Sequence, residues 1–75
     1  MPSDFVEETA EDGAVTLRFS GDLSIASVGE LPERLREYDG NVDRLDISET
    51  GYIDTVGAWL IHRTARDTEA EIIGA

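Results

Sequence analysis

The 75-residue sequence predicts a small α/β domain in which a mixed sheet of about four strands carries two helices on one face. Two segments, residues 14–20 and 42–48, have the apolar pattern of strands, and weaker strand patterns precede and follow them. Two further segments place apolar residues at helical spacing, so the elements follow the order β β α β α β. Because strands alternate with helices, parallel pairing is expected, and residues 1–75 are expected to form a single domain.

The first two strands are expected to form a hairpin. In AVTLRFS (residues 14–20), apolar and polar residues alternate strictly, which is typical of a strand with one face buried. The preceding DFVEET (residues 4–9) is a weaker strand, and Gly13 between them favours a turn. GDLS, at residues 21–24, is expected to end the strand.

The first helix follows a short irregular segment. Four apolar residues recur at helical spacing: Val28, Leu31, Leu35 and Tyr38. Pro32 has no N–H donor and therefore belongs in the first turn, so the regular helix is predicted to begin near Leu31, after a looser turn at residues 25–30. The stop signal is the pair Asp39 and Gly40.

The second half of the chain repeats the order of strand and helix. VDRLDIS (residues 42–48) is a strong strand, and ETGY (residues 49–52) is expected to form a turn after it. Asp54 is predicted to be the N-cap of the second helix, because its carboxylate can accept hydrogen bonds from N–H groups of the first turn. AEIIGA (residues 70–75) is expected to form a short strand with both isoleucines buried.

A helical wheel divides the second helix into two faces. The half that we expect to be buried contains Gly57, Leu60, Ile61, Thr64, Ala65 and Thr68. The opposite half contains Thr55, Val56 at its edge, Trp59, His62, Arg63 and Arg66. Trp59 is therefore predicted to point outward. Tryptophan and arginine are enriched where interface binding energy concentrates, so these six residues are predicted to bind a protein partner.

Each of these side chains also has an interpretation that needs no partner. Trp59 is large enough to fold over the edge of the helix and cover neighbouring strand ends. His62 can be an ordinary surface histidine, since a metal site needs several ligands. Arg63 and Arg66 can complement the negative C-terminal end of the helix.

Composition excludes several classes of function. The formal net charge is −11, with six arginines and no lysine, so nucleic acid is not an expected partner. Solubility alone explains an acidic surface, and a basic partner or a salty cytoplasm are the alternatives. The chain contains no cysteine, which excludes disulfides and thiolate metal sites. Its apolar runs are too short for direct membrane insertion by this segment.

The polar residues do not assemble into a catalytic or metal-binding pattern. Asp43, Asp46, Glu49 and Asp54 lack the ligand spacing of a calcium loop, which favours a solvated acidic rim over a cation site. The chain has one histidine and no cysteine or lysine, and no serine has a neighbouring base. The sequence therefore predicts a protein that is not an enzyme and has no cofactor and no metal.

Two stretches of the sequence resemble a known family. VDRLDISETGYIDTVGAWLI (residues 42–61) resembles the central signature of STAS domains, found in sulphate transporters and anti-sigma factor antagonists, in which strand, loop, Asp-Ser-Ser-Gly and helix follow in order. VTLRFSGDLS (residues 15–24) resembles the family's preceding strand and Gly-Glu/Asp-Leu turn. The resemblance covers nearly all of residues 14–73. It implies a non-enzymatic module whose second helix and preceding loop bind a protein partner.

The signature differs from that of the anti-sigma factor antagonists at one informative position. In that branch a kinase phosphorylates the second serine of the signature, and this chain has Val56 there, which cannot accept phosphate. Thr55 matches the first serine, and its phosphorylation stays chemically open. DTVG and GAWLIHR are similar to the STAS subunit, or N-terminal STAS domain, of Mla-type phospholipid ABC transporters, where the threonine contacts the ATPase.

The resemblance therefore implies an accessory domain of an ABC-type phospholipid transporter permease that docks on the ATPase subunit. Its expected location is the cytoplasm, at the cytoplasmic face of the inner membrane, through the permease of the same chain. The alternative is a free-standing anti-sigma factor antagonist or scaffold subunit. The family usually has a further helix and strand, so we expect a fragment of a longer chain that continues past Ala75 and covers apolar surface at Ile72 and Ile73.

Overall fold

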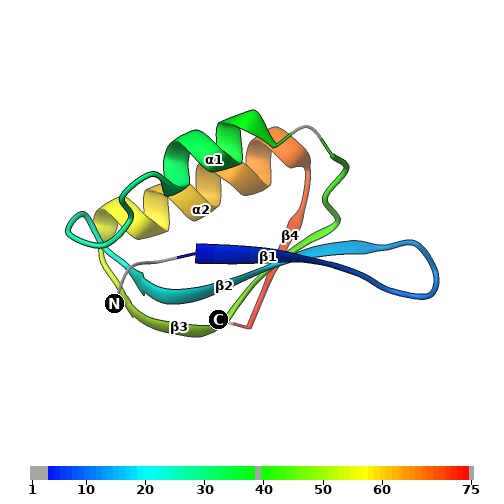
Figure 1. Cartoon of the computed structure of the whole chain (residues 1–75), viewed down its shortest axis with the longest axis horizontal. Coiled ribbons are helices and arrows are strands. Elements are labelled where there is room, and N and C mark those ends of the chain that lie inside the picture. Colours follow the sequence, from blue (N-terminus) through cyan, green and yellow to red (C-terminus); the bar gives the residue numbers. More distant parts are fainter. Residues whose placement is uncertain (1–3, 39, 75) are drawn as a thin grey trace.

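The computed structural model describes residues 4–38 and 40–74 and shows one four-stranded sheet with both helices on the same face (Figure 1). Its elements are β1 (Asp4–Thr9), β2 (Val15–Leu23), α1 (Leu31–Glu37), β3 (Arg44–Ile53), α2 (Thr55–Thr68) and β4 (Glu71–Ile73). The strand order is β1-β2-β3-β4. β1 is antiparallel to β2, and the other two pairs are parallel. The predicted fold class and order of elements are confirmed.

The β1–β2 hairpin projects beyond the helices at one end of the molecule (Figure 1). In its turn the Ala10 N–H donates to the Ala14 carbonyl at 2.8 Å, and Gly13 has a φ of 88°, a conformation that side-chain-bearing residues rarely adopt. Phe5 faces Phe19 across the pair, and their ring centroids are 5.8 Å apart. The hairpin therefore forms as its alternating pattern predicts.

The core lies between the sheet and the two helices. Its buried residues are Leu17, Phe19, Leu23, Leu31, Leu35, Val42, Leu45, Leu60 and Ile61. Helix α1 begins at Leu31 with Pro32 in its first turn, as predicted. An ion pair between Arg34 and Asp4 links α1 to β1. The predicted stop residue Asp39 lies outside the described residues.

Two turn predictions were wrong, because β2 and β3 are longer than their local patterns indicate. GDLS (residues 21–24) does not end the strand, since β2 continues to Leu23. ETGY (residues 49–52) is not a turn, since β3 continues to Ile53, which pairs with Leu23. The pairing is irregular near Gly21, whose φ of 78° fits the extra twist of a bulge. Hydrogen bonding between neighbouring strands therefore overrides the local turn signals.

The C-terminal strand β4 leaves an apolar cleft at its side. Ile72 and Ile73, which were predicted to be buried, are half-buried. A cleft of about 360 Å³ is lined by Ile47, Ile53, Ala58, Ile61, His62 and Ile72. Coverage of this surface by a further segment stays a prediction, and Ala75 lies outside the described residues. Within the described part of the chain, neither helix has the length and apolar character needed to cross a bilayer.

Candidate functional site

Asp54 joins β3 to α2 and accepts hydrogen bonds from two segments at the end of the molecule where α2 begins. Its Oδ1 accepts a hydrogen bond from the Gly57 N–H at 2.9 Å, so Asp54 is the N-cap of α2. Its Oδ2 accepts from the Ile25 N–H at 3.0 Å, which ties the loop after β2 to the start of the helix. Hydrogen bonds from Gly57 and then Ile25 hold the pKa of Asp54 below its ordinary value, because they favour the carboxylate form.

The start of α2 also lies directly against the end of β2. A Cβ added at Gly57 would be 1.9 Å from the carbonyl oxygen of Leu23, so only glycine permits this approach. The Asp54 N–H donates to the same carbonyl at 3.0 Å. The start of α2 is therefore positioned by backbone contacts with the end of β2.

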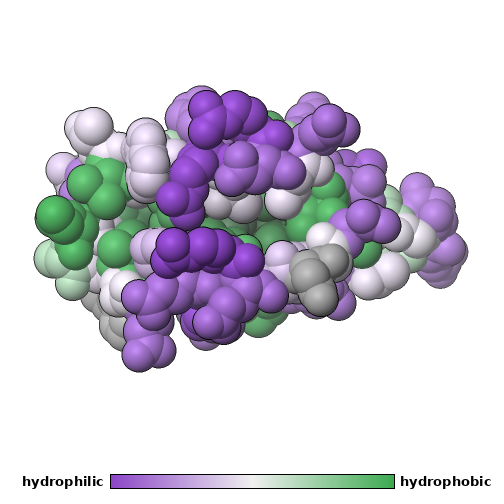
Figure 2. Space-filling view, turned by 90° about the horizontal axis from the view of Figure 1, so that it is seen from above, coloured by the Kyte–Doolittle hydropathy of each residue, from purple (hydrophilic) through white to green (hydrophobic). Residues whose placement is uncertain are grey.

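Four large apolar side chains are exposed at this end of the molecule, and we call them the end patch: Ile25, Tyr52, Val56 and Trp59. Trp59 is 57% exposed, Val56 37%, Tyr52 64% and Ile25 72%. In the part of the chain that the structure describes, the fifth exposed large apolar residue is Val6 on β1. Figure 2, seen from above the helices, shows apolar surface at the left end of the molecule and further apolar surface between polar residues near its middle. All four belong to segments around Asp54, because Ile25 is hydrogen-bonded to it and Tyr52, Val56 and Trp59 lie within five residues of it in the sequence.

Two members of the end patch were not identified from the sequence. The hydrogen bond to Asp54 holds Ile25 beside the helix start, and the Tyr52 N–H donates to Asp22 Oδ1 at 3.0 Å. Ile25 and Tyr52 belong to no apolar periodicity. The sequence signal was a large apolar side chain within a polar segment. Such a pattern indicates an exposed side chain but does not predict its neighbours in space.

The residues predicted on the outer face of α2 are distributed over three neighbouring regions. Thr55 is exposed beside Val56 in the end patch, and the guanidinium of Arg63 lies over the Trp59 ring, 4.8 Å from its centroid. His62 is exposed on the flank of α2, where it lines the apolar cleft beside β4. The side chain of Arg66 is 79% exposed near the end of the helix. Thr55, Trp59 and Arg63 are spaced four residues apart and therefore share one face of α2.

The acidic residues considered as a cation site have separate structural contacts. Asp43 Oδ2 accepts from the Val15 N–H at 2.8 Å, and Asp46 Oδ1 accepts from the Ser48 N–H at 2.9 Å. The hydrogen bonds from Ser48 lower the pKa of Asp46. Within residues 4–38 and 40–74, no three potential ligands gather closely enough to hold a metal ion. These carboxylates therefore accept hydrogen bonds from backbone N–H groups of the sheet.

Comparison with known proteins supports the fold. A crystal structure of an antisigma-factor antagonist, a STAS domain from Rhodobacter sphaeroides, matches with a TM-score of 0.73 and 17% sequence identity. The match covers 97% of this chain and 87% of that chain. No family model matches the sequence, and no curated protein matches it. At this level of identity the likeness shows the fold alone, so the chain has a STAS-like fold.

Proposed function

We propose that this domain is a non-enzymatic protein-interaction module that docks on the ATPase subunit of an ABC-type phospholipid transporter. The observation that carries the proposal is the end patch, because four of the five exposed large apolar side chains in the described residues lie around the start of α2. Apolar and aromatic side chains gathered on an otherwise charged surface are typical of the centre of a protein interface.

The two residues at the start of α2 support docking without a phosphate switch. Val56 occupies the position of the phosphorylated serine in the resemblance described above, and it is exposed but has no hydroxyl. Thr55, in the position of the first serine, is exposed at the first turn of the helix and can donate or accept a hydrogen bond with a partner. The assignment to a permease of the same chain rests on the resemblance of DTVG and GAWLIHR, and it places the domain at the cytoplasmic face of the membrane.

Calorimetric titration with the ATPase subunit tests this proposal. Trp59→Ala is expected to weaken binding about thirtyfold, the size of effect that truncation of an aromatic anchor produces. Thr55→Ala is expected to weaken it by a smaller factor. Val6→Ala is the matched control, because Val6 is 56% exposed but lies on β1, and its truncation should leave the affinity unchanged. Equal affinity of the wild-type, Trp59→Ala and Thr55→Ala proteins would exclude this surface.

Reading the parent gene is an independent test of the transporter assignment. A permease in the same chain requires several apolar runs of about 20 residues after this domain. A reading frame that encodes about another 25 residues of soluble helix and strand would instead favour a free-standing subunit.

The second candidate function is a free-standing anti-sigma factor antagonist or scaffold subunit. The observation in its favour is the structural match to a protein described as an antisigma-factor antagonist. Phosphotransfer in this chain would have to use Thr55, since Val56 has no hydroxyl. Mass spectrometry after incubation with cell extract and ATP tests phosphotransfer, because docking on an ATPase predicts no phosphate on Thr55; the reading frame described above distinguishes the permease from the free-standing subunit.

A further inference from the structure

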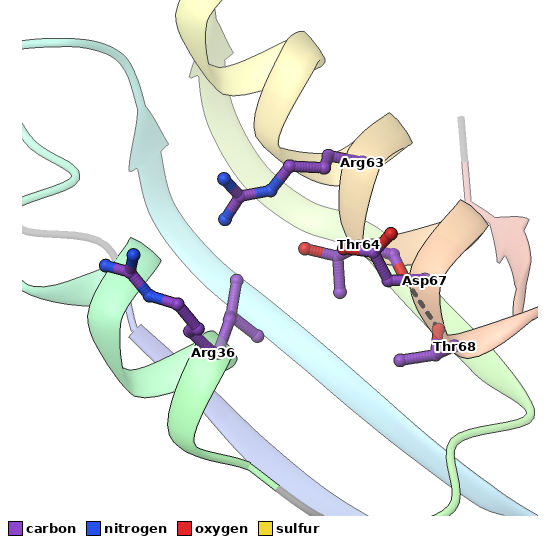
Figure 3. A pocket seen from close by; sticks show the side chains of 6 residues that line it. Arg36, Arg63, Thr64, Asp67 and Thr68 are labelled. Atoms are coloured by element: carbon purple, nitrogen blue, oxygen red, sulfur yellow. Dashed lines mark hydrogen bonds between the residues drawn. The ribbon is translucent and has the colours of Figure 1, made fainter.

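A cleft between the two helices brings together two arginines from different elements. It has a volume of about 180 Å³ and is lined by Leu35, Arg36, Arg63, Thr64, Asp67 and Thr68. Figure 3 shows the side chains of Arg36, from α1, and Arg63, from α2, extending toward the same end of this cleft. The cleft adjoins the end patch, because Arg63 also stacks on Trp59.

Neither arginine is neutralised by a carboxylate of the described chain. In residues 4–38 and 40–74 the ion pairs of arginine involve Arg18, Arg34 and Arg66, although the chain has 17 acidic and six basic residues. A guanidinium that stacks on an aromatic ring keeps its in-plane N–H groups available to a carboxylate. Arg63 can therefore contact Trp59 and an anion at the same time.

The other polar groups of the cleft already have partners. The Thr64 hydroxyl donates to the Leu60 carbonyl at 2.8 Å, and the Thr68 hydroxyl donates to the Thr64 carbonyl at 2.7 Å. Asp67 Oδ1 is 3.9 Å from Arg66 Nε. The formal charge of the lining residues is therefore positive, with Arg36 and Arg63 against Asp67 alone, and a bound carboxylate would offset it.

We propose that Arg36 and Arg63 together bind a carboxylate side chain of the protein partner. The proposal rests on the docking function above and adds the chemistry of the partner, which presents an Asp or Glu to the cleft beside apolar residues that contact the end patch. The planar fork of each guanidinium matches a carboxylate and forms charge-assisted hydrogen bonds with it. A doubly charged phosphate is disfavoured by Asp67 and by the net charge of −11.

NMR of the arginine Nε–H groups tests the anion chemistry. Sodium acetate, added at constant ionic strength, is expected to shift the Arg36 and Arg63 signals along one common saturation curve. Arg36→Gln should weaken the response of Arg63 about tenfold, the effect of losing one charge-assisted hydrogen bond. Arg18→Gln on the sheet is the control and should leave the curve unchanged. Absence of saturation, saturation by inorganic phosphate but not by acetate, or an unchanged curve in Arg36→Gln would overturn the proposal.

Titration with the ATPase subunit identifies the source of the carboxylate. Arg36→Gln is expected to weaken ATPase binding about tenfold, although Arg36 lies outside the end patch. If Trp59→Ala weakens binding and Arg36→Gln does not, the docking function stands and the carboxylate site is overturned. If the ATPase does not bind but acetate saturates the wild-type site and Arg36→Gln weakens it, the ATPase assignment fails and the carboxylate site stands.

Discussion

The two faces of α2 differ in what holds their side chains. On the inward face, Gly57 and Leu60 are buried against the sheet, and Leu60 is only 1% exposed. On the outward face, Trp59 is adjacent in sequence to Leu60 but 57% exposed. A domain of this size buries a smaller share of its unfolded surface than larger domains do, and its one tryptophan has the largest side chain available for the core. This exposure of Trp59 supports the docking role proposed above for the outward face.

The largest expected effect on stability comes from substituting alanine for one residue on each face of α2. Leu60→Ala should lower the free energy of unfolding by about 2–5 kcal/mol, because it removes a fully buried side chain and leaves a cavity. Trp59→Ala should lower it by less than about 1 kcal/mol, since the indole is 57% exposed and an exposed cation–π contact such as that with Arg63 contributes about 0.5–1 kcal/mol. Urea unfolding followed by circular dichroism measures both. Equal decreases in stability in the two variants would contradict the separation of the faces.

The next largest effect on stability compares a buried and an exposed residue in the first turn of α2. Gly57→Ala should lower the free energy of unfolding by about 1–3 kcal/mol, because the new methyl group overlaps the backbone carbonyl of Leu23 and forces α2 away from β2. Thr55→Ala, on the exposed side of the same turn, should change it by no more than about 0.5 kcal/mol. Thermal unfolding distinguishes them, and a Gly57→Ala protein as stable as the wild type would show that α2 does not rest on β2.

The smallest effect concerns Asp54, the N-cap of the same helix. Its pKa is lowered in the folded state, so its ionised form adds stability above the unfolded pKa of about 3.9, and that stability is lost as the pH falls through the lower folded value. Asp4, through the hydrogen bond from Arg34, and Asp46 act in the same direction. Asp54→Asn keeps a cap but cannot titrate, so its stability should depend less on pH below about 4 than that of the wild type.

Unfolding measured in buffers across this acidic range checks the expectation. The Asp12→Asn protein is a suitable control, because Asp12 lies in the exposed hairpin turn and accepts from the Ala14 N–H two residues away. A variant Asp54→Asn with the full pH dependence of the wild type would show that its hydrogen bonds to Gly57 and Ile25 do not favour the ionised form.

Much of the fold could be predicted from local patterns. The alternation of residues 14–20, the helical spacing around Leu60 and the cap at Asp54 each depend on side chains a few positions apart. The lengths of β2 and β3 could not be predicted this way, because GDLS and ETGY contain turn-forming residues that pair across the sheet. Each strand supplies hydrogen-bonding partners for the other, and this pairing cannot be predicted from the local sequence of either segment.

Some residues of the candidate site could likewise be predicted from local spacing, and others could not. Trp59 and Thr55 could be placed outside the core from helical periodicity, since Gly57, Leu60 and Ile61 occupy the inward side. Ile25 and Tyr52 could not be assigned to the end patch, because contacts with residues about 30 positions away hold them there. The sequence by itself determined the order of elements and the inward face of α2, because both follow from short-range spacing. Only the tertiary structure decided the composition of the end patch and the meeting of Arg36 with Arg63, because both depend on how α2 lies against the loop after β2 and against α1.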